Sequence, residues 1–374
     1  MIIRRPDRLA LLAALPLLAV ACGDNTREPR ASRDTNPATA AASALRQSIE
    51  TATFSPPDPE TETTVQAPGA GAVAPANPAD RAGPVDAALP DDARPDPAMV
   101  RVQVLLDRTR FSPGIIDGLG GQNTRQAIAA FEAANDLTVD GELDPAVFQR
   151  LTGNDGGRVL IDYTITEADV AGPFIGTLPT DLAAMARLDT VGYADAREAL
   201  AEKFHMTEAL LDALNPGADF TRAGQTLVVA QTGPNPMQGE VSRIVVSKSE
   251  QSVRAFAADG TLLAFYPATI GSSEMPSPSG AYTVRAIAPE PNYTYDPSRV
   301  SYGKGGSKVV VPAGPNNPVG SVWIDLSRDT YGIHGTAEPS KIGKTASSGC
   351  VRLTNWDVEQ LAGAVKAGGE GRFT

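Results

Sequence analysis

The sequence predicts a multidomain protein with a disordered N-terminal linker, a small three-helix bundle, an α+β module and a C-terminal all-β domain. Three observations lead to this prediction. Residues 23–98 contain 12 prolines and one aromatic residue, apolar residues recur at helical spacing in residues 99–152, and short β-rich runs separated by Gly and Pro fill residues 241–374. The length of 374 residues also suits two to three domains of ordinary size.

Composition excludes several classes of function. The formal net charge is −12 at pH 7, so the chain lacks the cationic surface that binds phosphate backbones, and nucleic acid is excluded as a partner. Two cysteines and two histidines provide neither a disulfide framework nor a Cys-rich zinc site. Composition thus excludes a Cys-rich zinc site, and the family resemblance described below implies that no metal or other cofactor is needed.

The first 22 residues have the pattern of an export signal. Three arginines precede an apolar run at 9–21, which is too short for a comfortable transmembrane helix and ends at Cys22. The sequence Ala-Val-Ala-Cys at 19–22 resembles a bacterial lipobox, which implies lipidation of Cys22. Cleavage near Ala21 and an uncleaved anchor are the alternatives. We expect an exported, periplasmic protein that is lipid-anchored to a bacterial membrane.

Residues 23–98 are rich in Pro, Ala, Thr, Asp and Glu. Such a segment has too few large apolar side chains to offset the entropy lost on ordering, so we predict a disordered tether over the whole range.

Residues 99–152 combine helical spacing with two turn signals, Asp117-Gly118 and Asp140-Gly141. Asp-Gly after an apolar residue favours a turn with positive φ at Gly. Three short helices joined by two such turns resemble a peptidoglycan-binding-like domain, with Glu132 where that family often has Gln. A three-helix spacer without a ligand is the alternative.

Residues 158–231 predict a strand at 160–165, helices at 199–204 and 210–214, an Asn-Pro-Gly break and a closing strand at 225–229. This order resembles the second half of a LysM module, a fold that grips glycan chains, with an insertion between 165 and 196. We expect His205 to be a surface or capping residue with no role in chemistry.

Residues 241–374 predict an all-β domain. Strands are expected at 244–247, 253–256 and 262–265, with a hairpin turn at Asp259-Gly260, and further strands at 280–286, 308–312 and 322–325. Residues 368–374 depart from the last strand that the family resemblance described below implies, so we expect this strand to be shortened at a sheet edge.

One His and one Cys of this domain form a candidate catalytic pair. His334 precedes Cys350 by 16 positions, and each has a Gly neighbour. A thiol needs an adjacent base or cation to react at neutral pH, and imidazole serves as one. Arg352 would point to the same side as Cys350 in an extended segment, where it could lower the thiol pKa or bind a carboxylate. The backbone N–H groups of Gly349 and Cys350 are candidates for an oxyanion hole.

The motifs His334-Gly335-Thr336 and Ser347-Ser348-Gly349-Cys350-Val351-Arg352 resemble the signature of L,D-transpeptidases of the YkuD family. The segments 276–280 and 314–320 match two further parts of that family, and Ser348 stands where many members have His. The resemblance implies catalytic roles for Cys350, His334 and the carbonyl of Gly335. It implies substrate-binding or oxyanion roles for Arg352, Gly349, Ser348, Ser347 and Thr336.

The resemblance also implies a reaction and partners. Cys350 would form a thioester with a peptidoglycan stem peptide, and an amine of a second stem would resolve it into a 3-3 cross-link. Glycan strands would be bound by the accessory modules, and carbapenem β-lactams would inhibit. Water or a lipoprotein side chain as the acceptor, and a non-catalytic tether that binds the cell wall, are the alternatives. We expect the catalytic domain to keep its chemistry when separated from the accessory modules.

Overall fold

The computed structural model describes residues 37–54, 94–154, 157–233, 236–271, 275–299, 306–347 and 349–374. The signal segment with Cys22, most of the linker, and Ser348 lie outside the described residues. Within the described ranges, no helix is both long enough and apolar enough to cross a membrane.

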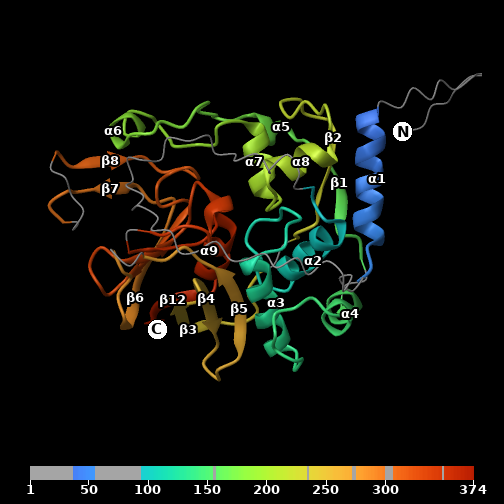
Figure 1. Cartoon of the computed structure of the whole chain (residues 1–374). Coiled ribbons are helices and arrows are strands. Elements are labelled where there is room, and N and C mark those ends of the chain that lie inside the picture. Colours follow the sequence, from blue (N-terminus) through green and yellow to red (C-terminus); the bar gives the residue numbers. More distant parts are fainter. Residues whose placement is uncertain are drawn as a thin grey trace, which may run out of the picture. The chain divides into compact units, whose positions relative to one another are not determined.

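Part of the predicted disordered linker is a helix. Helix α1, Pro37–Thr51, packs its buried residues Ala42 and Ile49 against the helices that follow. Glu50 accepts hydrogen bonds from the backbone N–H groups of Val159 and Leu160, and Figure 1 shows α1 alongside β1. The prediction of disorder is therefore wrong for residues 37–51, where an apolar stripe finds a partner that is distant in sequence.

The predicted three-helix bundle is present as α2 (Pro97–Arg108), α3 (Gln122–Ala134) and α4 (Pro145–Asn154). Both Asp-Gly turns have the expected geometry, with φ of +74° at Gly118 and +73° at Gly141. Gln103 Oε1 accepts the N–H of Gly118 at 2.8 Å, and Glu132 Oε2 accepts that of Gly141 at 2.9 Å. Glu132 thus fills the same structural position as a Gln, which explains why the substitution is tolerated.

Residues 160–230 contain the predicted strand, helix pair and closing strand, together with two short helices in the insertion. The elements are β1 (Leu160–Thr164), α5 (Glu167–Val170), α6 (Leu182–Met185), α7 (Ala196–Lys203), α8 (Glu208–Leu214) and β2 (Thr226–Ala230). Strands β1 and β2 pair antiparallel. The resemblance to LysM stays a prediction.

The accessory segments are not separate modules. One hydrophobic core joins buried residues of α1, α2, α3, α4, β1, α7, α8 and β2, and it includes Phe265 from the C-terminal domain. The backbone of Phe265 also bonds to Ser112 and Arg110 of the helical segment. A fragment that begins near residue 238 would expose Phe265, so we expect it to be less stable than the whole chain. That such a fragment keeps its chemistry stays a prediction.

The C-terminal domain is built on an eight-stranded sheet with the order β11-β10-β9-β6-β12-β3-β4-β5. Its strands are β3 (Val241–Ser247), β4 (Ser252–Phe256), β5 (Leu262–Pro267), β6 (Gly280–Pro289), β9 (Val322–Leu326), β10 (Gly332–His334), β11 (Val351–Arg352) and β12 (Val365–Phe373). A separate hairpin pairs β7 (Tyr293–Tyr295) with β8 (Val309–Val311), and β8 contacts α6 of the insertion. The predicted hairpin around Asp259-Gly260 is β4–β5.

Two expectations for this domain are wrong. The last strand is not shortened at an edge: β12 has nine residues and lies between β6 and β3. The domain also contains a helix, α9 (Asn355–Ala362), and a short 3₁₀ turn, Pro339–Lys341. The Thr354 side chain accepts the N–H of Asp357 and caps α9, a cap signature that a β-only interpretation overlooks.

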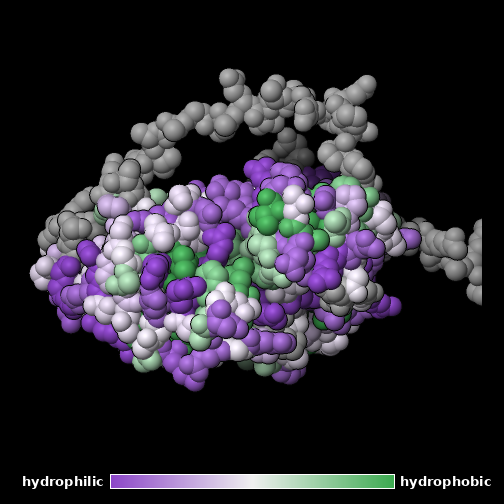
Figure 2. All heavy atoms as spheres, turned by 90° about the horizontal axis from the view of Figure 1, so that it is seen from below, coloured by the Kyte–Doolittle hydropathy of each residue, from purple (hydrophilic) through white to green (hydrophobic). Residues whose placement is uncertain are grey.

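Exposed apolar surface is sparse in the described part of the chain. Val139 and Val310 are its large exposed hydrophobic residues, and Figure 2 shows hydrophobic side chains in small patches among hydrophilic ones. Among the described residues, these exposed hydrophobic side chains do not form a continuous apolar face of the kind that marks a protein–protein interface.

A buried polar cluster lies where α9 meets the accessory segments. The His205 ring stacks on Trp356 with centroids 4.7 Å apart, and its Nδ1 lies 3.0 Å from Asp107 Oδ1. Ser112 Oγ donates to Asp357 Oδ2 at 3.0 Å. His205 has φ of +56° just after α7. It therefore follows the end of a helix as expected, and its side chain is half-buried, 20% exposed, at the interface with α9.

This cluster should make stability depend on pH. Burial raises the pKa of Asp357 to about 7. Burial lowers the pKa of His205, yet the neighbouring Asp107 carboxylate raises it further, so the net shift is upward. Both groups stabilise the fold while protonated and lose that contribution as pH rises through their folded-state pKa.

We therefore expect the free energy of unfolding to fall between pH 5 and pH 8, by on the order of 2–4 kcal/mol. Calorimetric melting temperatures over this range measure the effect. Asp357→Asn, whose Oδ1 still accepts from Ser112, should make the profile less steep. His205 and Glu202, whose pKa values are also raised, should supply the remaining slope. A wild-type profile that is already flat, or an unchanged slope in the variant, would contradict this origin of the pH dependence.

Candidate active site

Strand register brings the two candidate catalytic residues together. β10 pairs parallel with β11, so His334 lies opposite Arg352 and Ile333 lies opposite Val351. Continuing the register by one residue places Cys350 opposite Gly332, two residues along β10 from His334 and therefore on the same face of the sheet. The predicted pair is thus brought to neighbouring strands at one end of the sheet, and both side chains line one cavity.

His334 is held in one tautomer and one orientation. The side chain is buried, and Nδ1 lies 2.7 Å from the carbonyl oxygen of Gly335. A carbonyl can only accept, so Nδ1 carries the proton and Nε2 is the nitrogen that can take a second one. Trp323, opposite His334 on β9, stacks on the imidazole with centroids 5.4 Å apart.

The turn before Cys350 is braced by two serine hydroxyls. Ser347 Oγ accepts the N–H of Gly349 at 3.1 Å and donates to the Cys350 carbonyl at 2.5 Å. Ser277 Oγ donates to the Gly349 carbonyl at 2.5 Å. Gly349 has φ of +117°, a conformation that favours glycine. The Gly349 N–H donates to Ser347, so an oxyanion role for it requires this bond to open, and that role stays a prediction.

The Cys350 thiol lies against the carbonyl oxygen of Thr330, with Sγ 3.5 Å away. Thr330 has φ of +66°, which is rare for a β-branched residue and marks backbone strain beside the thiol. Burial raises the pKa of the Cys350 thiol, and a backbone hydrogen bond from Gly332 and the charge of Arg352 oppose this rise. Arg352 therefore acts on the thiol in the expected direction but does not by itself make it a thiolate.

The cavity around Cys350 and His334 measures about 700 Å³. It is also lined by Ser347 and Arg352, as predicted. Sequence reasoning missed the rest of its polar and aromatic wall: Arg285, Tyr293, Thr294, Asp296, Arg299, Lys308, Trp323, Asp325, Asp329, Thr330 and Tyr331. Tyr293 and Thr294 come from the β7–β8 hairpin, which carried no local motif.

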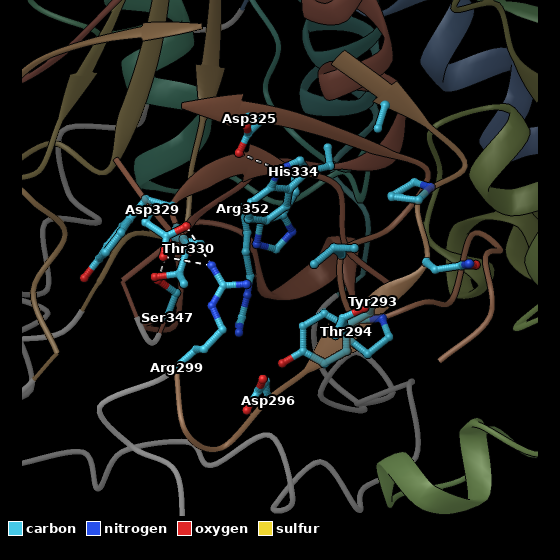
Figure 3. A pocket seen from close by; sticks show the side chains of 18 of the residues that line it. Tyr293, Thr294, Asp296, Arg299, Asp325, Asp329, Thr330, His334, Ser347 and Arg352 are labelled. Carbon is cyan, nitrogen blue, oxygen red and sulfur yellow. Dashed lines mark hydrogen bonds and ion pairs between the residues drawn. The ribbon is translucent and has the colours of Figure 1, made fainter. Parts of the chain in front are cut away.

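Charges in the cavity wall are largely paired. Arg299 reaches Asp329 at 2.8 Å (Figure 3), and Arg285 Nε donates to Asp325 at 2.8 Å. Both pairs are partly exposed, so their net contribution to stability is small. They place two guanidinium groups at the cavity, where an acidic substrate can compete for them.

Thr336 has a different place from the one predicted. It is buried, its N–H donates to Asn355 Oδ1 at 3.1 Å, and its hydroxyl accepts the N–H of Glu338 at 3.2 Å. Thr336 does not belong to the cavity wall among the described residues. Through these two hydrogen bonds Thr336 fixes the backbone conformation of the segment that follows His334.

Comparison with known families gives two matches. The model of the L,D-transpeptidase catalytic domain, YkuD, matches residues 242–371, and a model described as "Putative peptidoglycan binding domain" matches residues 95–151.

Curated relatives match the same region. "Putative L,D-transpeptidase YkuD" of Bacillus licheniformis is 31% identical over 173 residues, which are 46% of this chain and 88% of that protein. "Probable L,D-transpeptidase ErfK/SrfK" of Escherichia coli K12 is 34% identical over 160 residues, which are 41% of this chain and 51% of that protein, about half its length.

Solved structures give weaker matches. The "L,D-transpeptidase from Mycobacterium smegmatis" aligns with a TM-score of 0.30 and 18% identity over 40% of this chain and 63% of that one. L,D-transpeptidase 3 from Mycobacterium tuberculosis, in complex with a faropenem-derived adduct, aligns with the same score and identity over 40% of this chain and 67% of that one.

Proposed function

Because the chain belongs to the L,D-transpeptidase family, we propose that it is a cysteine acyltransferase acting on the stem peptides of bacterial peptidoglycan. The observation that carries the proposal is the pairing of a cavity-lining thiol with an imidazole whose Nδ1–H is fixed by the Gly335 carbonyl at 2.7 Å. That arrangement leaves Nε2 of His334 to exchange the proton of Cys350.

The first half-reaction is acylation. His334 Nε2 takes the Sγ proton, and the thiolate attacks the carbonyl that joins an L-centre to the following D-residue. The C–N bond breaks, His334 returns the proton to the departing amine, and a thioester remains on Cys350. The raised thiol pKa supports this order, because a thiol that stays protonated needs a base at the moment of attack.

The second half-reaction is transfer. The neutral side-chain amine of a diamino acid on another stem attacks the thioester, and His334 Nε2 takes the amine proton. The C–S bond breaks, His334 returns the proton to the departing Cys350 thiolate, and a 3-3 cross-link forms. The Gly335 carbonyl supports the imidazolium in both steps, which is the role that a carboxylate has in other triads. Arg352 and the Arg299 guanidinium at the cavity suit the carboxylates of stem peptides.

We propose that glycan strands and stem peptides are also bound by residues 95–151, which match the peptidoglycan-binding model. Export to the periplasm and a lipid anchor at Cys22 belong to the same proposal and rest on the sequence of residues 1–22. Carbapenems would acylate Cys350 as mimics of the donor.

Product analysis tests the choice of acceptor. Purified protein is incubated with tetrapeptide-containing muropeptides, and the products are separated by chromatography and identified by mass spectrometry. Dimers joined 3-3 are the expected main product. Trimmed tripeptide monomers would mean that water is the acceptor, and unchanged muropeptides would favour a wall-binding tether without catalysis.

A further inference from the structure

Asn355, the first residue of α9, occupies a fully satisfied buried position. Its Oδ1 accepts the N–H groups of Ser321 at 3.0 Å and Thr336 at 3.1 Å. Its Nδ2 donates to the Pro315 carbonyl at 3.1 Å and to Glu202 Oε1 at 2.8 Å. Two N–H donors on one side and two acceptors on the other fix which amide atom is oxygen and which is nitrogen.

One peptide group links Asn355 to the catalytic imidazole. The peptide between Gly335 and Thr336 accepts Nδ1–H of His334 through its C=O and donates its N–H to Asn355 Oδ1. Bonds at both ends of a peptide polarise each other. A Cβ atom at Gly335 would overlap Asn355 Oδ1, so the amide is packed directly on the residue that holds His334.

Glu202 lies on α7, in the accessory segment and 153 positions from Asn355. Its carboxylate also accepts the Tyr193 hydroxyl at 3.2 Å. Burial raises the pKa of Glu202 to about 7, and Glu198 and Glu359 add to the rise, while the hydrogen bonds from Asn355 and Tyr193 oppose it. The accessory segment thus contributes a half-buried acid, hydrogen-bonded to Asn355 and Tyr193, to this contact. A mere spacer would not need such a group there.

We propose that Asn355 and Glu202 are positioning residues for His334, so that the accessory segment forms part of the active-site framework. Glu202 accepts a hydrogen bond from the Asn355 amide, and Asn355 Oδ1 accepts one from the N–H of the Gly335–Thr336 peptide. The carbonyl of that peptide accepts the Nδ1–H of His334. The proposal rests on the proposed function, because it assigns His334 the role of proton carrier.

The test compares four variants of the whole chain. Glu202→Leu removes the acceptor for Asn355, and Glu202→Gln keeps one through Oε1. Asn355→Ala removes the acceptor for Thr336. Asp169→Asn is the matched control: Asp169 bonds Lys203 of the same helix α7 at 2.7 Å and Tyr163 at 2.5 Å, and it does not touch Asn355.

Two readouts are measured: the rate of Cys350 acylation by a carbapenem, and the pH titration of His334 by imidazole NMR, in which two histidines give two sets of signals. Glu202→Leu and Asn355→Ala should slow acylation by roughly 10-fold or more, within the ~10²-fold that a 1 Å misplacement costs. Both should also shift the His334 titration. Glu202→Gln should stay within about 2-fold of wild type, and Asp169→Asn should leave the titration unchanged.

The outcomes separate the two claims. Wild type without acylation at Cys350 would overturn the proposed function. If the wild type is acylated and Glu202→Leu has the same acylation rate and the same His334 titration, that result would overturn only the positioning role. Equal losses in Glu202→Leu and Asp169→Asn would mean general destabilisation of the accessory segment and would also overturn it.

Discussion

Replacement of Cys350 by alanine is expected to abolish both turnover of stem peptides and covalent labelling by a carbapenem. The reason is chemical: no covalent intermediate can form without the thiol that lines the cavity beside His334. The measurement is intact mass before and after exposure to the carbapenem. The cleanest background carries Cys22→Ser, because the chain has two cysteines and Cys350 is then the sole thiol.

The fold should survive this change. The hydrogen bonds of the Cys350 thiol, to the Thr330 carbonyl at 3.5 Å and from the Gly332 backbone, are weak ones, so the melting temperature should stay close to that of the parent. Ser347→Ala is the matched comparison: it removes the brace of the same turn and should reduce the rate while leaving labelling possible. Labelling that persists in Cys350→Ala would refute the assignment of the nucleophile.

Replacement of His334 by alanine should slow acylation by roughly 10²–10⁴-fold, the usual contribution of a positioned proton-transfer group. The loss should be large because burial raises the thiol pKa, so little thiolate exists without the base. Single-turnover acylation measured at several pH values gives the rate, and the variant should recover part of it at high pH, where the thiol ionises unaided.

His205 supplies the control. His205→Asn retains a residue that tolerates the left-handed φ of +56°. It should lower stability, through loss of the contacts to Asp107 and Trp356, with little effect on the acylation rate. Equal rate losses in both variants would show that the wrong histidine has been assigned.

Much of the local structure could be predicted because it depends on neighbours in sequence. The Asp-Gly turns at 117–118 and 140–141, the hairpin at 259–260, and the Cys350–His334 pair all follow from short motifs, and the structure has each of them. The family matches at 242–371 and 95–151 confirm the two resemblances that rested on those motifs.

The rest depends on contacts between distant residues. Helix α1 is ordered because Ile49 and Glu50 meet partners beyond residue 100, and a proline-rich composition gives no sign of that. β12 is glycine-rich, yet it pairs with both β6 and β3 in the interior of the sheet. Glu202 and Asn355 carry no motif, and only the fold makes them neighbours. The bond from the Gly349 N–H to the Ser347 hydroxyl likewise depends on the folded turn, and the motif alone does not show it.

The most direct measurement of the central claim is the mass of the acyl-enzyme formed with a stem tetrapeptide in the absence of an acceptor. We expect a mass increase equal to the tetrapeptide minus one molecule of free D-alanine, mapped by peptide digestion to Cys350 and absent from Cys350→Ala. An adduct on another residue, or turnover of the tetrapeptide in Cys350→Ala, would contradict it.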